Sequence, residues 1–218
     1  MAPTLTLSLD AKADAQLSKD PLALLIGMVL DQQVPLEKAF RGPYDLTQRL
    51  GVAKLDAAAL AAWDTDELIT AFVTPPALHR YPAAMARRVQ DLCRLVVDKH
   101  GGRADRIWRK AADGADLLAR VHALPGFGEQ KARIFVALLG KQLGVDVPGW
   151  REAAGPYGEE GSRRSVADIT GPESLAEVRA YKQQMKAAAK AGAGPAPASP
   201  GRAAKTAKPA KTAKARKG

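Results

Sequence analysis

Apolar residues recur at helical spacing through most of the chain, and Gly, Pro and Asp separate one run from the next. Leu92, Leu95 and Val96, for example, repeat at this spacing beside Arg87, Arg88 and Arg94. One face of this helix is therefore expected to be buried and the other to face solvent. The predicted helices cover residues 21–30, 35–50, 56–63, 65–73, 82–99, 105–111, 114–123, 129–143 and 172–189. Residues 5–9 alternate like a short strand, but no strand and helix alternation follows. The fold class predicted is all-α.

Two of these helices carry start signals. Asp20 precedes Pro21, which places a capping side chain before a first-turn proline. Asp64 and Thr65 precede a first turn that contains Asp66 and Glu67. Helices are therefore expected to begin close to residues 21 and 65.

The composition changes after residue 189, where small residues and proline give way to the repeat Ala-Lys-Thr-Ala-Lys at 204–208 and 210–214. Nine Lys and Arg and no acidic residue lie in 186–218, so 24 basic and 23 acidic residues remain in the rest of the chain. Without large apolar side chains this segment cannot offset the entropy of ordering. A helical domain over 1–189 and a disordered basic tail over 190–218 are predicted. The tail suits a polyanion, bound non-specifically, or is a solubilising extension.

Cysteine usage and hydropathy exclude several classes of protein. A single cysteine, Cys93, rules out an internal disulfide and argues against a cysteine-ligated zinc or iron–sulfur site. The longest apolar run, residues 21–30, is too short to span a bilayer, and the first residues lack a charged leader. A protein of the cytoplasm is expected, and the scattered histidines have no metal-ligand spacing.

The most informative segment is Leu124-Pro125-Gly126-Phe127-Gly128, which leads into an apolar helix. A Gly-x-Gly turn that opens a helix leaves free backbone N–H groups on a loop that can approach a phosphate closely. The helix dipole also favours an anion there. This segment is therefore predicted to hold a nucleic-acid backbone.

Together with Val145-Asp146 further on, this hairpin resembles the signature of the HhH-GPD superfamily of base-excision DNA glycosylases. The stretch from Leu24 to Val34, an apolar helix followed by a Gln-Gln turn, resembles an early segment of the same superfamily. The resemblance covers roughly residues 20–155 and implies a two-lobed helical fold. It also implies an enzyme that removes a damaged base from duplex DNA.

The resemblance assigns DNA contacts to two segments. Gln33, or less favourably Gln32, matches the side chain that fills the gap left by a flipped base, for which a planar amide is suited. A Gln that only closes the turn is the plainer alternative. Hairpin and helix contacts to the backbone are implied for Leu124, Pro125, Gly126, Phe127, Gly128, Gln130 and Lys131.

Asp146 matches the catalytic carboxylate of the superfamily. A carboxylate near the anomeric carbon can stabilise the positive charge that builds on the sugar and can activate a water. Asp146 also stands where it could cap a helix that begins at Pro148, and the two roles are compatible.

The chain also departs from the superfamily's pattern. The nucleophilic Lys of bifunctional members lies at the position of Gln130, and Lys131 follows, turned by about 100°. Monofunctional chemistry is therefore expected, with Lys131 on phosphate or facing solvent; a local shift that restores it as nucleophile is the alternative. Met28 replaces the Glu of the adenine-removing branch. Asp31 is unusual beside DNA, because it would repel phosphate unless it points away.

The four-cysteine iron–sulfur loop is missing, so no such cluster is expected and no side-chain metal site is predicted. The hairpin of this superfamily often binds one monovalent cation through backbone carbonyls. The resemblance therefore allows a monovalent cation at the hairpin of this chain. Phe127, Trp150 and Tyr157 could stack on a flipped base but are more in keeping with a core.

The sequence thus predicts a monomeric DNA glycosylase that acts on double-stranded DNA, away from membranes and near the nucleoid. Asp146 would activate water and Gln33 would fill the gap. A non-catalytic DNA-binding protein with a glycosylase-like fold is the alternative. The base that is removed cannot be read from the spacing of motifs.

Overall fold

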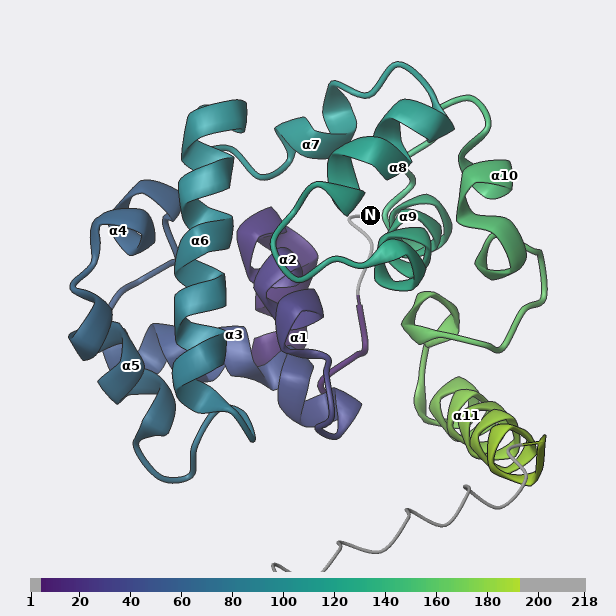
Figure 1. Cartoon of the computed structure of the whole chain (residues 1–218), viewed down its shortest axis with the longest axis horizontal. Coiled ribbons are helices and arrows are strands. Elements are labelled where there is room, and N and C mark those ends of the chain that lie inside the picture. Colours follow the sequence, from purple (N-terminus) through teal and green to yellow (C-terminus); the bar gives the residue numbers. More distant parts are fainter. Residues whose placement is uncertain (1–4, 193–218) are drawn as a thin grey trace, which may run out of the picture.

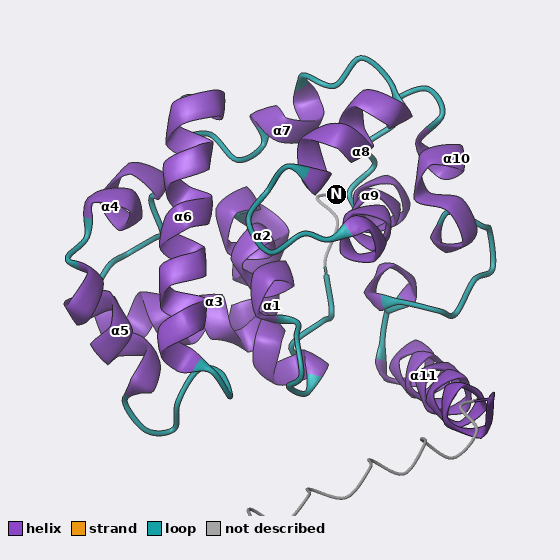
Figure 2. Cartoon of the chain, in the orientation of Figure 1, coloured by secondary structure: helices purple, strands orange, loops and turns teal. Residues whose placement is uncertain are grey.

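A computed structural model describes residues 5–192, and its regular elements are all helical (Figures 1 and 2). The all-α prediction is confirmed for this part of the chain. The elements are α1 (Ala11–Lys19), α2 (Pro21–Leu30), α3 (Leu36–Leu50), α4 (Ala57–Ala62), α5 (Thr65–Val73), α6 (Pro82–His100), α7 (Arg106–Arg109), α8 (Gly114–His122), α9 (Glu129–Gln142), α10 (Trp150–Ala154), α11 (Pro172–Gly192) and the 3-10 helices η1 (Gly155–Tyr157) and η2 (Val166–Asp168).

Every predicted helix is present, with ends that differ from the prediction by at most three residues. Two α-helices, α1 and α10, and both 3-10 helices were missed. α1 buries only Ala13, Asp14 and Leu17, so it has too few apolar residues at helical spacing for the sequence to predict a helix. α10 has five residues, which is little more than one turn.

The predicted strand at residues 5–9 is wrong. Leu5 and Leu7 are buried, as alternation requires, but their backbone N–H groups donate to the Ser18 and Asp14 side chains of α1 at 2.9 and 3.0 Å. Leu9 adopts a φ of 59°. The segment is thus tied to a helix by side-chain acceptors in place of a neighbouring strand.

Helix α2 lies at the centre of the molecule, and all its residues from Leu22 to Leu30 are buried (Figure 1). A helix that is apolar on every side needs such a position. The Asp20 carboxylate accepts from the Leu22 and Ala23 N–H groups, and Pro21 occupies the first turn, which confirms the predicted cap. The predicted Asp64 cap of α5 is confirmed in the same way.

The most extensive helix contacts fall within two groups, α1–α6 and α7–α11. One continuous set of buried side chains nevertheless runs through both. Cys93 lies within it, as expected of a lone cysteine, and burial raises the pKa of its thiol to about 12. The specific two-lobed glycosylase fold remains a prediction.

Within residues 5–192 no helix has the length and apolar character needed to cross a membrane. The predicted basic tail lies almost wholly outside the described residues, because α11 ends at Gly192.

Gly140 offers a test of the contact between α9 and α10. A Cβ there would lie 2.5 Å from ring carbons of the buried Trp150. Gly140→Ala should lower the free energy of unfolding by about 1–2 kcal/mol, because overpacking outweighs the gain in helix propensity. Urea denaturation measures the loss. Gly171→Ala, where a Cβ meets nothing within 4 Å, is the control and should stay within about 0.5 kcal/mol of the wild type. Equal stability of the two variants would contradict this packing.

Candidate nucleic-acid interface

The C-terminal end of α2 is buried, so its last carbonyl groups need hydrogen-bond donors from elsewhere. Lys131 supplies one, and its Nζ donates to the Met28 carbonyl at 2.6 Å and to that of Val29 at 3.4 Å. Gln32 supplies two more, from Nε2 to the Val29 carbonyl and from its backbone N–H to that of Leu30, both at 2.7 Å. The hairpin helix α9 and the Gln-Gln turn therefore meet at this helix end.

The two glutamines of the turn point in different directions. Gln32 is engaged at both ends of its amide, because its Oε1 also accepts from Arg88 Nη1 at 3.3 Å. Gln33 is exposed and adopts a left-handed φ of 54°, with its Oε1 at 3.5 Å from the Tyr81 hydroxyl. The Gln33 amide is therefore exposed, whereas the Gln32 amide has partners within the protein, so of the two candidates Gln33 is the one left open to a ligand.

The hairpin packs against the Arg88 side chain. Gly126 has a φ of 87°, and a Cβ on it would lie 2.8 Å from Arg88 Cδ. The Phe127 N–H donates to the Leu124 carbonyl at 3.1 Å, which closes the turn beside the half-buried Pro125. Gly128 is exposed and a Cβ there meets nothing within 4 Å. The accessible part of the hairpin is thus its last residue and the first turn of α9.

The Phe127 side chain does not face solvent. It is 3% exposed and packs edge-on against Phe135, with ring centroids 5.7 Å apart. Trp150 is buried as well. Of the aromatic residues considered for stacking, Tyr157 alone is partly open, and its hydroxyl accepts from Gln130 Nε2 at 2.8 Å. Gln130 is exposed beside it, and its contact with DNA stays a prediction.

Lys131 points into the protein, which overturns the expectation of a phosphate-bound or solvent-facing side chain. Burial lowers the pKa of its ammonium to about 8. The Asp31 carboxylate acts in the opposite direction, and the Arg88 guanidinium lowers the pKa further. An amine with this pKa is partly neutral close to neutral pH, which is the form that reacts with electrophiles.

Asp146 lies elsewhere. It is exposed, beyond the far end of α9, in a cavity of about 690 Å³ that Pro21 and Leu24 from the N-terminal half of α2 also line. Lys131 and the last residue of α9, Gln142, are about 16 Å apart along the helix axis. The structure therefore does not bring Asp146 together with Gln33 and the hairpin.

The predicted cap is also absent, because α10 begins at Trp150 with Gly149 as its N-cap and no side-chain cap. The loop that carries Asp146 is held at the end of α9 by the Val145 N–H, which donates to the Leu139 carbonyl at 3.1 Å.

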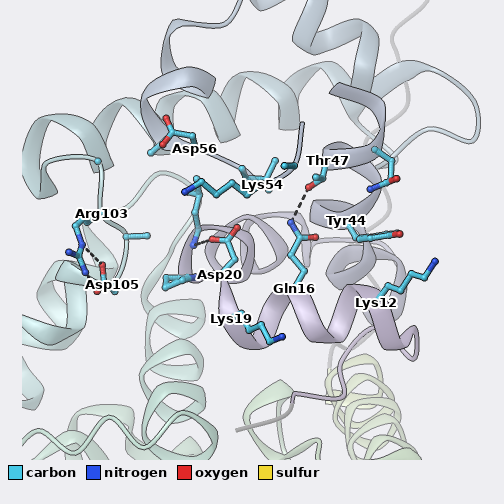
Figure 3. A pocket seen from close by; sticks show the side chains of 18 residues that line it. Lys12, Gln16, Lys19, Asp20, Tyr44, Thr47, Lys54, Asp56, Arg103 and Asp105 are labelled. Atoms are coloured by element: carbon cyan, nitrogen blue, oxygen red, sulfur yellow. Dashed lines mark hydrogen bonds and ion pairs between the residues drawn. The ribbon is translucent and has the colours of Figure 1, made fainter. Parts of the chain in front are cut away.

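A second cavity, of about 590 Å³, opens between α1, α3 and the segments before α4 and α7 (Figure 3). Its acidic groups already serve the fold. Asp20 and Asp56 cap α2 and α4, and Asp105 pairs with Arg103 at 2.9 Å. Burial raises the pKa of the Asp20 carboxyl. These groups support helix ends and do not converge on one reacting position.

No group of three His, Cys, Asp or Glu side chains within the described residues could hold a metal ion. A monovalent cation on hairpin carbonyls stays a prediction.

Sequence reasoning missed His79, Tyr81 and Arg88. His79 Nε2 lies 2.7 Å from the Gln32 carbonyl oxygen, and Tyr81 stands beside Gln33. Arg88 was predicted to lie on a solvent-facing side of its helix, but its side chain is half-buried against the hairpin. The residues around His79 in the sequence carry no signal that its partner is Gln32, which lies 47 residues earlier in the chain.

Comparison with protein-family models, curated proteins and solved structures finds no match for this chain. The contacts around the end of α2 are therefore the basis for a functional proposal.

The two hairpin glycines should respond differently to substitution. Gly126→Ala forces an L residue into a left-handed φ and against Arg88, so the free energy of unfolding should fall by about 1–3 kcal/mol. Gly128→Ala has a φ of −71° and open space, so its stability should stay within about 0.5 kcal/mol of the wild type. Urea denaturation distinguishes them, and a larger loss for Gly128→Ala would refute the hairpin geometry.

Proposed function

We propose that this protein is a monomeric base-excision DNA glycosylase, resembling the HhH-GPD superfamily, that acts on a damaged base flipped out of double-stranded DNA. The observation that supports it is the convergence at the end of α2 of Gln33, the hairpin and the Lys131 ammonium. A flipped base leaves a gap that must be filled and a distorted backbone that must be held. The exposed Gln33 amide suits the first task, and the N–H groups around Gly128 suit the second.

The surroundings of Gln33 suit a polyanion. Arg80 and Tyr81 are exposed on the adjoining segment, and the Arg80 guanidinium lies 5.5 Å from the Tyr81 ring centroid. Gln130 adds an exposed amide on the hairpin side. Cationic, aromatic and amide groups of this kind contact phosphate and unstacked bases.

The reacting group favoured by this geometry is Lys131, in place of the expected Asp146. A neutral Lys131 amine would form a bond to C1′ as the N-glycosidic bond breaks. The base leaves with its bonding electrons and takes up a proton, and the sugar ring opens to an imine that water later hydrolyses. With a pKa of about 8, roughly a tenth of the amine is neutral at pH 7. The Nζ must first leave the Met28 carbonyl.

That same hydrogen bond favours a second candidate function. The Lys131 ammonium donates to two carbonyls at the end of α2. Capping this helix end is a sufficient structural reason for the position of the side chain. The protein would then be a non-catalytic DNA-binding protein that uses Gln33 and the hairpin to recognise distorted DNA.

Excision assays with Lys131→Arg and Asp146→Asn separate these possibilities. The substrates are end-labelled duplexes that carry uracil, alkylated purines or oxidised bases, and alkali cleavage reveals abasic sites. Arg keeps a cation and donors for the α2 carbonyls but stays protonated, so it cannot be the nucleophile. We expect Lys131→Arg to bind duplex and to lose excision by about a hundredfold or more, with Asp146→Asn close to the wild type.

Loss of excision in Asp146→Asn, with Lys131→Arg active, would contradict the role of Lys131 and restore water activation by Asp146. No excision by the wild type on any substrate, with duplex binding intact, would support the non-catalytic candidate.

The rate of excision should depend on pH through Lys131. Because only the neutral amine attacks, the single-turnover rate should rise with pH and level off above a pKa near 8. Borohydride trapping of the protein–DNA imine, measured over the same pH series, reports the same step. A rate that stays flat from about pH 6 to 9 would contradict attack by Lys131.

A further inference from the structure

His79 is a buried histidine that the proposed chemistry does not use. It lies between α5 and α6, and its side chain belongs to the core, with the residue 2% exposed. Its Nδ1 accepts from the Tyr81 backbone N–H at 2.9 Å. A neutral ring that accepts at Nδ1 carries its proton on Nε2. Nε2–H therefore donates to the Gln32 carbonyl oxygen, 2.7 Å away.

This carbonyl belongs to the peptide group that joins Gln32 to Gln33. The φ angle of Gln33 is the torsion about its N–Cα bond, so it sets how the Gln33 Cα and side chain are oriented relative to that peptide plane. Its value of 54° is one that L residues rarely adopt. A donor that fixes the direction of the Gln32 carbonyl therefore fixes the direction in which the Gln33 side chain leaves the backbone. His79 is in a position to hold this strained turn from a segment 47 residues away.

We propose that His79 is a positioning residue, whose Nε2–H holds Gln33 in the conformation in which its amide can fill the gap left by a flipped base. The inference rests on the proposed function, because it assigns a task to Gln33. It adds a second layer to the proposed interface: Gln33 and Tyr81 are exposed, and His79 lies behind them, joined to the Gln32 carbonyl and to the Tyr81 backbone N–H.

The tautomer is maintained by the surroundings of the ring. Burial lowers the pKa of His79, and Lys38 of α3 and Lys131 of α9 act in the same direction, whereas the Gln32 and Leu30 carbonyls oppose it. Arg80 and Tyr81 flank the ring on its own segment. A protonated ring would turn an Nδ1–H toward the Tyr81 N–H and lose that bond, so the neutral form is the one that keeps both hydrogen bonds.

A pair of matched variants tests the inference. The amide nitrogen of Gln in His79→Gln reaches about as far as Nε2 and can still donate to the Gln32 carbonyl, whereas the shorter Asn in His79→Asn reaches only the place of Nδ1. Gln33→Ala is the reference for loss of the gap-filling side chain. Base flipping is followed by the fluorescence of 2-aminopurine in a duplex, and binding of the same duplex by fluorescence anisotropy.

We expect the wild type and His79→Gln to give a rise in 2-aminopurine fluorescence. His79→Asn and Gln33→Ala should reduce the flipped population about fivefold, as loss of one hydrogen bond implies, with duplex affinity changed much less. A rise that Gln33→Ala abolishes and His79→Asn preserves would overturn the positioning role and leave the proposed function standing. No rise with the wild type would overturn both.

Nitrogen NMR of the histidine rings gives an independent readout that does not depend on DNA. The spectrum of the wild type should show His79 as the neutral Nε2–H tautomer at neutral pH. A neutral Nδ1–H tautomer, which has no proton on Nε2 to donate, would overturn the inference even where the variants fail to fold.

Discussion

The constraint on which the structure depends is the buried C-terminal end of α2. A helix that is apolar on all sides can fill the centre of the molecule, but its last carbonyls then lie where water does not reach them. Lys131 and Gln32 provide the donors, and the two bring α9 and the turn after α2 to the same place. The hairpin is fixed there in turn, because Gly126 rests on Arg88, which donates to Gln32.

This constraint joins stability to chemistry at Lys131. The end of a helix carries partial negative charge and favours a cation, whereas burial disfavours one. Burial and the Arg88 guanidinium, opposed by the Asp31 carboxylate, leave an amine with a pKa of about 8 where the two groups of helices meet. In the proposed function this partly neutral amine is the group that attacks the sugar, beside the amide proposed to fill the gap and the turn proposed to bind phosphate. DNA that draws the ammonium from α2 would have to provide compensating contacts.

The sequence predicted what depends on local physics. The ends of α2 and α5 followed from their caps and apolar runs, and Cys93 followed from its apolar surroundings. Features that depend on distant partners could not be predicted. Residues 5–9 alternate like a strand, yet α1 supplies their acceptors, and the direction of Lys131 depends on which helix end α9 meets. Asp146 has the spacing of a catalytic residue, but its loop stays at the far end of α9.

The central claim is that DNA binds where the Gln-Gln turn and the hairpin meet at the end of α2. Amide hydrogen exchange, with and without a duplex that carries an abasic-site analogue, tests it most directly. The proposed function predicts that DNA slows exchange in both the turn at residues 31–33 and the hairpin at residues 126–131, and leaves the loop at residues 143–147 unchanged. Protection confined to residues 143–147 would contradict the claim and move the interface to the cavity beside Asp146.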